Sequence, residues 1–140
     1  MKSSSIILRI VQGLVVLGMF VASAPGVSHA FDRDGERVRA HSFGLDHAVN
    51  DSVTAGTDAN DWHYVELMRD GQLTVTVKVT PGNSNPTISI TNASGEELVA
   101  SSSAPGGEHK LTVKAVAGVY YIHIASGTGE SKYTMTAHLE

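Results

Sequence analysis

Apolar and polar side chains alternate with a strict two-residue period through much of the second half of the chain. Residues 72–79, 110–115, 120–124 and 132–139 place apolar or tyrosine side chains at every second position, with mostly Thr, Lys or His between them. Successive side chains of a β-strand point to opposite faces of the sheet, whereas a helix repeats every 3.6 residues. The period therefore indicates strands with one buried and one solvated face, as in antiparallel sheets.

Turn-forming residues separate these runs. Gly, Pro, Asn or Asp occur at residues 70–71, 81–86, 92–95, 105–107 and 127–129. Glycine allows positive φ angles and proline has no backbone donor for a ladder, so both end strands. We predict an all-β fold, an antiparallel β-sandwich of about seven or eight short strands, with no helix after residue 30. The side chains expected between its two sheets are Leu73, Val75, Val77, Ile88, Ile90, Leu111, Val113, Tyr120, Ile122, Ile124, Tyr133 and Met135.

The first thirty residues have the features of a secretory signal peptide. Lys2 and Arg9 are their only Lys or Arg residues, and residues 10–21 are apolar apart from Gln12. Small residues at positions 28 and 30 favour cleavage after Ala30. The alternative, an uncleaved anchor, is disfavoured because the apolar run is shorter than the roughly 20 residues of a membrane span. We expect a secreted or periplasmic protein with no membrane insertion after cleavage.

Two further segments follow the predicted signal peptide 1–30. Residues 31–45 are rich in charge and follow neither a strand nor a helix period. We interpret them as a charged N-terminal segment that is a flexible arm or a loosely docked leader, with a recognition arm as the functional alternative. Residues 46–140 form the predicted β-sandwich domain.

Composition excludes several partners and chemistries. Residues 31–140 carry eight basic and fourteen acidic side chains, a net charge of −6. An acidic surface argues against nucleic acid and anionic lipid as partners. Because the chain has no cysteine, disulfides, a thiol nucleophile and cysteine-bound zinc are excluded.

The order of these elements resembles the bacterial pre-peptidase C-terminal domain family over about residues 50–139. Residues 58–67 read Asp-Ala-Asn-Asp-Trp-His-Tyr-Val-Glu-Leu, and a glycine turn and an alternating strand follow. Residues 117–124 resemble the late Gly-x-Tyr-Tyr strand of that family, and residues 133–136 resemble its closing strand. The resemblance implies a jelly-roll-like β-sandwich, usually an appendage of exported enzymes that aids secretion or binds protein or polysaccharide surfaces. Two features depart from the family: we expect only a signal peptide, and no enzyme, before the domain, and His63 stands where a second aromatic residue is usual.

No motif of a hydrolase accompanies the predicted sandwich. Neither Gly-x-Ser-x-Gly nor His-Glu-x-x-His occurs in the sequence. We therefore expect no catalytic residues and a secreted, non-catalytic accessory or binding module that recognises a protein or polysaccharide surface. The alternative is a small secreted enzyme, or a protease inhibitor or secretion aid that acts on an extracellular peptidase.

An oxygen-rich group precedes the first alternating strand. Asp58, Asn60 and Asp61 lie at loop spacing, and Asn50 and Asp51 stand on the segment before them. Calcium takes six to eight oxygen ligands from such groups. We predict a calcium site at Asp58, Asn60 and Asp61, with an Asx turn that bonds its own backbone as the alternative.

A pair of histidines is the second candidate for a metal site. If residues 126–131 form a hairpin loop, Ala125 pairs with Lys132, and His123 and His138 lie about 13 Å apart along the ladder. That separation is too large for one ion, so both histidines are expected to be solvated surface residues.

Three aromatic residues are candidates for a binding face. Alternation places Trp62 and Tyr64 opposite to Val65 and Leu67, and Tyr121 opposite to its apolar neighbours. Outward-facing aromatic side chains bury large areas at low entropic cost and are common in interfaces. We predict a binding face of Trp62, Tyr64 and Tyr121; the alternative for Trp62 is a cap at the edge of the sandwich.

Overall fold

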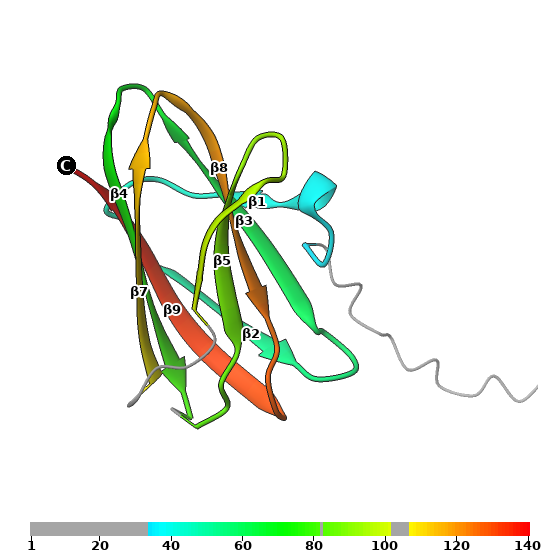
Figure 1. Ribbon diagram of the computed structural model, residues 1–140. Coiled ribbons are helices and arrows are strands. Elements are labelled where there is room, and N and C mark those ends of the chain that lie inside the picture. The colour runs from blue at the N-terminus through cyan, green and yellow to red at the C-terminus, as the bar shows by residue number, and fades with distance from the viewer. Residues whose placement is uncertain (1–33, 82, 102–106) are drawn as a thin grey trace, which may run out of the picture. The chain divides into compact units, whose positions relative to one another are not determined.

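A computed structural model describes residues 34–81, 83–101 and 107–140. Within these residues nine strands form two sheets, and one short 3₁₀ helix precedes the strands (Figure 1). The elements are η1 (Arg37–Arg39), β1 (His41–Ser42), β2 (Val49–Thr54), β3 (Asn60–Leu67), β4 (Gly71–Thr80), β5 (Thr87–Asn92), β6 (Glu97–Ser101), β7 (Glu108–Ala115), β8 (Gly118–Ala125) and β9 (Glu130–Leu139). The predicted signal peptide 1–30 lies outside the described residues, and no helix within the described ranges is long and apolar enough to cross a membrane.

The two sheets pack face to face as a β-sandwich, which confirms the predicted fold class. One sheet has the strand order β1-β3-β8-β5-β6 and the other β2-β9-β4-β7. Neighbouring strands are antiparallel except for β1 and β3, which are parallel. The strands beyond the expected number are β1 and β2, which come from residues that have no two-residue apolar period.

The core consists of the inward-facing side chains of both sheets. All twelve side chains predicted to be buried are at most 9% exposed. The same cluster is completed by Val53, Val65, Leu67, Val79, Ala115, Ala137 and Leu139. Every second residue is buried along β3, β4, β7, β8 and β9, which confirms the predicted register of the alternating strands.

The expected hairpin between β8 and β9 is wrong. β8 pairs with β3 and β5 in one sheet, whereas β9 pairs with β2 and β4 in the other. The loop between them therefore crosses the sandwich, and Ala125 pairs with Asn60 and Thr87 instead of Lys132. His123 lies opposite Trp62 and His138 lies opposite Thr74, so the two histidines lie in different sheets.

The described part of the charged N-terminal segment is docked on the sandwich, which is one of the two forms expected for residues 31–45. In its described part, residues 34–45, the backbone N–H of Trp62 donates to the carbonyl of Asp34 at 2.9 Å. β1 then pairs with β3, and Phe43 packs against the core. These residues form a docked arm along the edge of the five-stranded sheet, because backbone pairing holds the segment where its sequence shows no period.

Candidate metal centre and aromatic face

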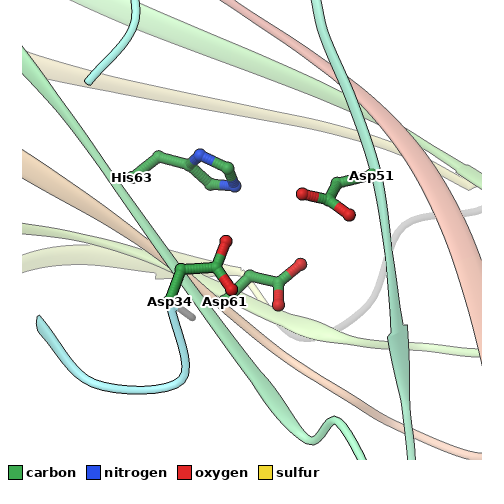
Figure 2. A group of neighbouring side chains, drawn as sticks. All are labelled: Asp34, Asp51, Asp61 and His63. Carbon is green, nitrogen blue, oxygen red and sulfur yellow. The ribbon is translucent and has the colours of Figure 1, made fainter. Parts of the chain in front are cut away.

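Three carboxylates and one imidazole meet at the edge of the sandwich. Each of Asp34, Asp51, Asp61 and His63 offers a donor atom, and these atoms all lie within 4.8 Å of one another (Figure 2). We call these four residues the acid–histidine cluster. Asp34 comes from the docked arm, Asp51 from β2, and Asp61 and His63 from β3.

Strand geometry explains why these side chains converge. Asp61 and His63 are two residues apart on β3, so both point inward on the face that carries Val65 and Leu67. Asp51 lies on β2, the edge strand of the opposite sheet, and is directly paired with Tyr133 of β9. The cluster thus joins the two sheets, with Asp51 exposed and the other three members buried.

A tyrosine hydroxyl connects two members of the cluster. The Oη of Tyr133 donates to Oδ2 of Asp61 at 2.6 Å and lies 2.7 Å from Nε2 of His63. Its phenol ring meets the imidazole of His63 edge-on, with the ring centroids 6.1 Å apart. Tyr133 therefore fixes the positions of Asp61 and His63 relative to each other.

Burial determines the protonation of the cluster. Burial raises the pKa of Asp61 to about 8; the hydrogen bond from Tyr133 opposes this rise, and the carboxylates of Asp34, Asp58 and Asp51 add to it. Burial also lowers the pKa of His63 to about 4, so its imidazole is neutral at pH 7. The cluster therefore combines a proton-retaining carboxyl group with a neutral imidazole.

A second group of polar and aromatic side chains lies on the outward face of the same strand. Trp62 stacks on His123 with 4.1 Å between ring centroids and 10° between planes. Tyr64 and Tyr121 lie next to this pair with centroids 6.0 Å apart. Trp62 is directly paired with His123, and Tyr64 with Tyr121, on the neighbouring strands β3 and β8. The four rings therefore form one contiguous surface. We call Trp62, Tyr64, Tyr121 and His123 the aromatic face.

The docked arm borders the aromatic face. The guanidinium carbon of Arg37 lies 5.3 Å from the ring centroid of Tyr121, within the range of a cation–π contact. Nη1 of Arg37 also donates to the carbonyl of Ala93 at 3.2 Å. At the other side, a hollow of about 530 Å³ lies beside Tyr64 and is lined in part by residues 42–45 of the arm.

No protein-family model and no curated protein matches this sequence. Among solved structures, the pre-peptidase C-terminal domain of a collagenase from Bacillus anthracis superimposes with a TM-score of 0.61. The two are 18% identical, and the match covers 70% of this chain and 93% of that one. The protein has the fold of a pre-peptidase C-terminal domain. The fold inferred from the Asp-Trp strand and the Gly-x-Tyr-Tyr strand is thereby confirmed.

Two further solved structures match this chain with TM-scores below 0.5. A periplasmic inhibitor of g-type lysozyme from Aeromonas hydrophila is 15% identical, with a TM-score of 0.45 over 72% of this chain and 97% of that one. A carbohydrate-binding module of Cellvibrio mixtus lichenase 5A is 17% identical, with a TM-score of 0.43 over 68% and 88% of the two chains.

Within this fold, two of the residues predicted to bind calcium, Asn60 and Asp61, point to opposite faces of β3. Asp61 is in the acid–histidine cluster, but Asn60 precedes it on the strand and therefore faces outward, where its Oδ1 lies 2.9 Å from Nε2 of His123. Asp58 belongs to the turn that follows β2, where its backbone bridges to Thr54. Of the predicted trio, only Asp61 is a member of the acid–histidine cluster, and calcium binding by the trio stays a prediction.

The other members of the cluster differ in how visible they are in the sequence. Asp51 is recognisable in the sequence as an oxygen donor on the segment before Asp58. Asp34 and His63 were missed, although His63 shares the inward face with Asp61. The predicted face of Trp62, Tyr64 and Tyr121 is brought together by β3 and β8, and the structure adds His123. Each of these three aromatic side chains is partly exposed.

Proposed function

We propose that the protein is a secreted or periplasmic, non-catalytic binding module that recognises a protein or polysaccharide surface through the aromatic face. The observation that carries this proposal is the pair of cross-strand ring contacts, Trp62 with His123 and Tyr64 with Tyr121, on the outward side of two inner strands. Such a surface is rigid because each ring is held by a neighbour on the adjacent strand. Binding to it therefore costs little side-chain entropy.

The outer side of the four-stranded sheet has a different chemistry. There β4, β7 and β9 present mainly Thr and Lys side chains, such as Thr76, Thr112 and Lys132. Threonine and lysine are less common than Trp and Tyr at the energetic centre of interfaces. The aromatic face is thus the better candidate of the two outer surfaces.

The chemistry of the aromatic face suits two classes of polymer. Flat rings stack on the apolar faces of sugar rings and also pack against proline-rich or aromatic protein surfaces. The Arg37 guanidinium at its border adds hydrogen-bond donors for carbonyl or carboxylate groups. The hollow beside Tyr64 extends this surface toward the docked arm.

A co-sedimentation assay tests the proposal. The purified protein is mixed with insoluble chitin, cellulose, peptidoglycan, collagen and gelatin, and the bound fraction is measured. With a polymer that binds, Trp62→Ala and Tyr121→Ala should each weaken the affinity by about tenfold or more. The matched variants Thr76→Ala and Thr112→Ala, on the other sheet, should leave it unchanged.

Two results would contradict the proposed function. One is binding that survives Trp62→Ala and Tyr121→Ala but is lost in the threonine variants, which would place the interface on the other sheet. The other is reproducible inhibition of a peptidase, or hydrolysis of a substrate, that is lost on replacing a single Asp or His. That second result would support the inhibitor or enzyme alternative.

A further inference from the structure

We propose that the acid–histidine cluster of Asp34, Asp51, Asp61 and His63 is a binding site for a divalent transition metal ion, Zn²⁺ foremost, in preference to calcium. The four side chains come from three separate segments and place their donor atoms within 4.8 Å of one another. In Figure 2 the imidazole and the three carboxylates face a common space. This proposal concerns a different surface from the aromatic face and stands independently of the proposed function.

The chemistry of the donors selects the kind of metal. Zinc is commonly held by imidazole nitrogen together with carboxylate oxygen, usually with four ligands. Calcium instead takes six to eight oxygen ligands, and nitrogen is a poor substitute for them. An imidazole at the centre of a small carboxylate group therefore favours zinc and its transition-metal neighbours.

The positions of Asp61 and His63 in the strand give a second reason to expect a ligand. Both occupy inward-facing positions of β3 that continue into Val65 and Leu67, where apolar side chains would fill the core. Asp61 is 2% exposed and His63 is 1% exposed. Burying a carboxyl group and an imidazole at such positions is costly. The Tyr133 hydroxyl offsets part of that cost, and a bound cation would offset more of it.

The cluster is also held in place by neighbouring groups. The Tyr133 hydroxyl contacts Oδ2 of Asp61 and Nε2 of His63, so it holds both side chains in place and leaves Oδ1 of Asp61 and Nδ1 of His63 for a metal ion. Phe43 packs edge-on against the His63 ring with centroids 6.2 Å apart. Asp34 is positioned by the backbone bond from Trp62 to its carbonyl. A metal ion would thus meet donors whose directions are already restricted.

Calorimetry on the purified protein, made without a polyhistidine tag and stripped with a chelator, tests the site. Titration with ZnCl₂ should show binding at one equivalent, and CaCl₂ should bind at least about tenfold more weakly. Titration with Co²⁺ should produce visible absorption bands that report nitrogen and oxygen coordination. Absence of stoichiometric Zn²⁺ binding, or calcium binding as tight as zinc binding, would overturn the proposal.

Variants assign the binding to the cluster. Asp51→Asn changes an exposed side chain, so the protein should remain folded, while Zn²⁺ affinity should fall by about tenfold or more. His63→Gln should remove the preference for zinc over calcium. If His63→Gln does not fold, the Asp51→Asn result alone decides: unchanged Zn²⁺ affinity in that variant would refute the site.

A matched control comes from a second His–Asp pair in the same protein. Nδ1 of His138 lies 2.6 Å from Oδ1 of Asp46, and both side chains are exposed. The double variant Asp46→Asn/His138→Gln should leave Zn²⁺ affinity and the Co²⁺ spectrum unchanged. Loss of binding in this control would show that the zinc binds at the exposed pair and would overturn the assignment.

Discussion

Tyr133 and Asp61 are joined across the core by a 2.6 Å hydrogen bond in which the phenol hydroxyl donates to the carboxyl oxygen Oδ2. Tyr133 belongs to β9 of the four-stranded sheet and Asp61 to β3 of the five-stranded sheet, and they are 3% and 2% exposed. The two sheets otherwise meet mainly through apolar side chains. This bond and the 2.7 Å contact of the same hydroxyl with His63 form a polar connection between them.

Replacing Tyr133 by Phe should destabilise the protein by about 1–3 kcal/mol, because two buried polar groups lose their common partner. The free energy of unfolding from urea denaturation at pH 7 measures the effect. Tyr121→Phe is the matched control: it removes a hydroxyl from the outward face and should cost less than about 0.5 kcal/mol. Equal losses in the two variants would show that the Tyr133 hydroxyl makes no special contribution.

Stability should fall as the pH rises from 6.5 to 8 when a chelator is present. The pKa of Asp61 is about 8 in the folded protein against an ordinary value of 3.8, so the folded state keeps a proton that the unfolded chain loses. The stability that this proton supplies is complete below pH 3.8 and is lost as the pH rises through 8. His63 acts in the opposite sense, because its pKa falls from 6.5 to about 4 and its contribution is lost as the pH falls through that range.

The two effects oppose each other between pH 4 and 6.5, and only Asp61 acts between 6.5 and 8. The expected loss over the upper interval is up to about 2 kcal/mol, because one pKa unit corresponds to about 1.4 kcal/mol. Urea denaturation at the two ends of the interval measures this slope, and Asp61→Asn should flatten it. A slope that persists in Asp61→Asn would assign it to another group.

Residue alternation was sufficient to predict the core but not the neighbours of each strand. A two-residue period predicts which side chains of a strand share a face, and all twelve predicted core residues are buried as this period requires. The period does not predict which strands are neighbours in a sheet. The segment 126–131 has the length of a hairpin loop, yet it carries the chain from β8 in one sheet to β9 in the other. That choice depends on long-range packing between strands.

The candidate site could be predicted in part for the same reason. Asp61 and His63 share a face of one strand, so their pairing was accessible from the sequence, as was the outward placement of Trp62 and Tyr64. Asp34 was not accessible, because it reaches the cluster through a backbone bond to Trp62 in a segment without a period. The role of the aromatic face in binding stays a prediction.

The core register can be checked with one pair of variants. Ile122 is fully buried on β8, so Ile122→Ala should cost about 2–5 kcal/mol through lost burial and the remaining cavity. Thr76 faces outward on β4, and Thr76→Ala should change the free energy of unfolding by less than about 0.5 kcal/mol. Comparable losses at the two positions would contradict the assignment of inward and outward faces.

Docking of the N-terminal arm predicts a specific pattern of proteolysis. Trypsin cleaves after Arg37 and Arg39, and the arm is held on both sides of these residues, by the bond from Trp62 to Asp34 and by the packing of Phe43. Cleavage therefore requires local undocking, which is governed by the contacts of the arm and not by global stability. Phe43→Ala should weaken docking by about 1.4 kcal/mol and raise the cleavage rate about tenfold.

The control Val38→Ala, at a side chain that is 87% exposed, should leave the rate unchanged. Mass spectrometry of the fragments identifies the cleaved bonds. Equally fast cleavage in the wild type and both variants would mean that the arm is flexible in solution, as the charge-rich sequence of residues 31–45 first indicated.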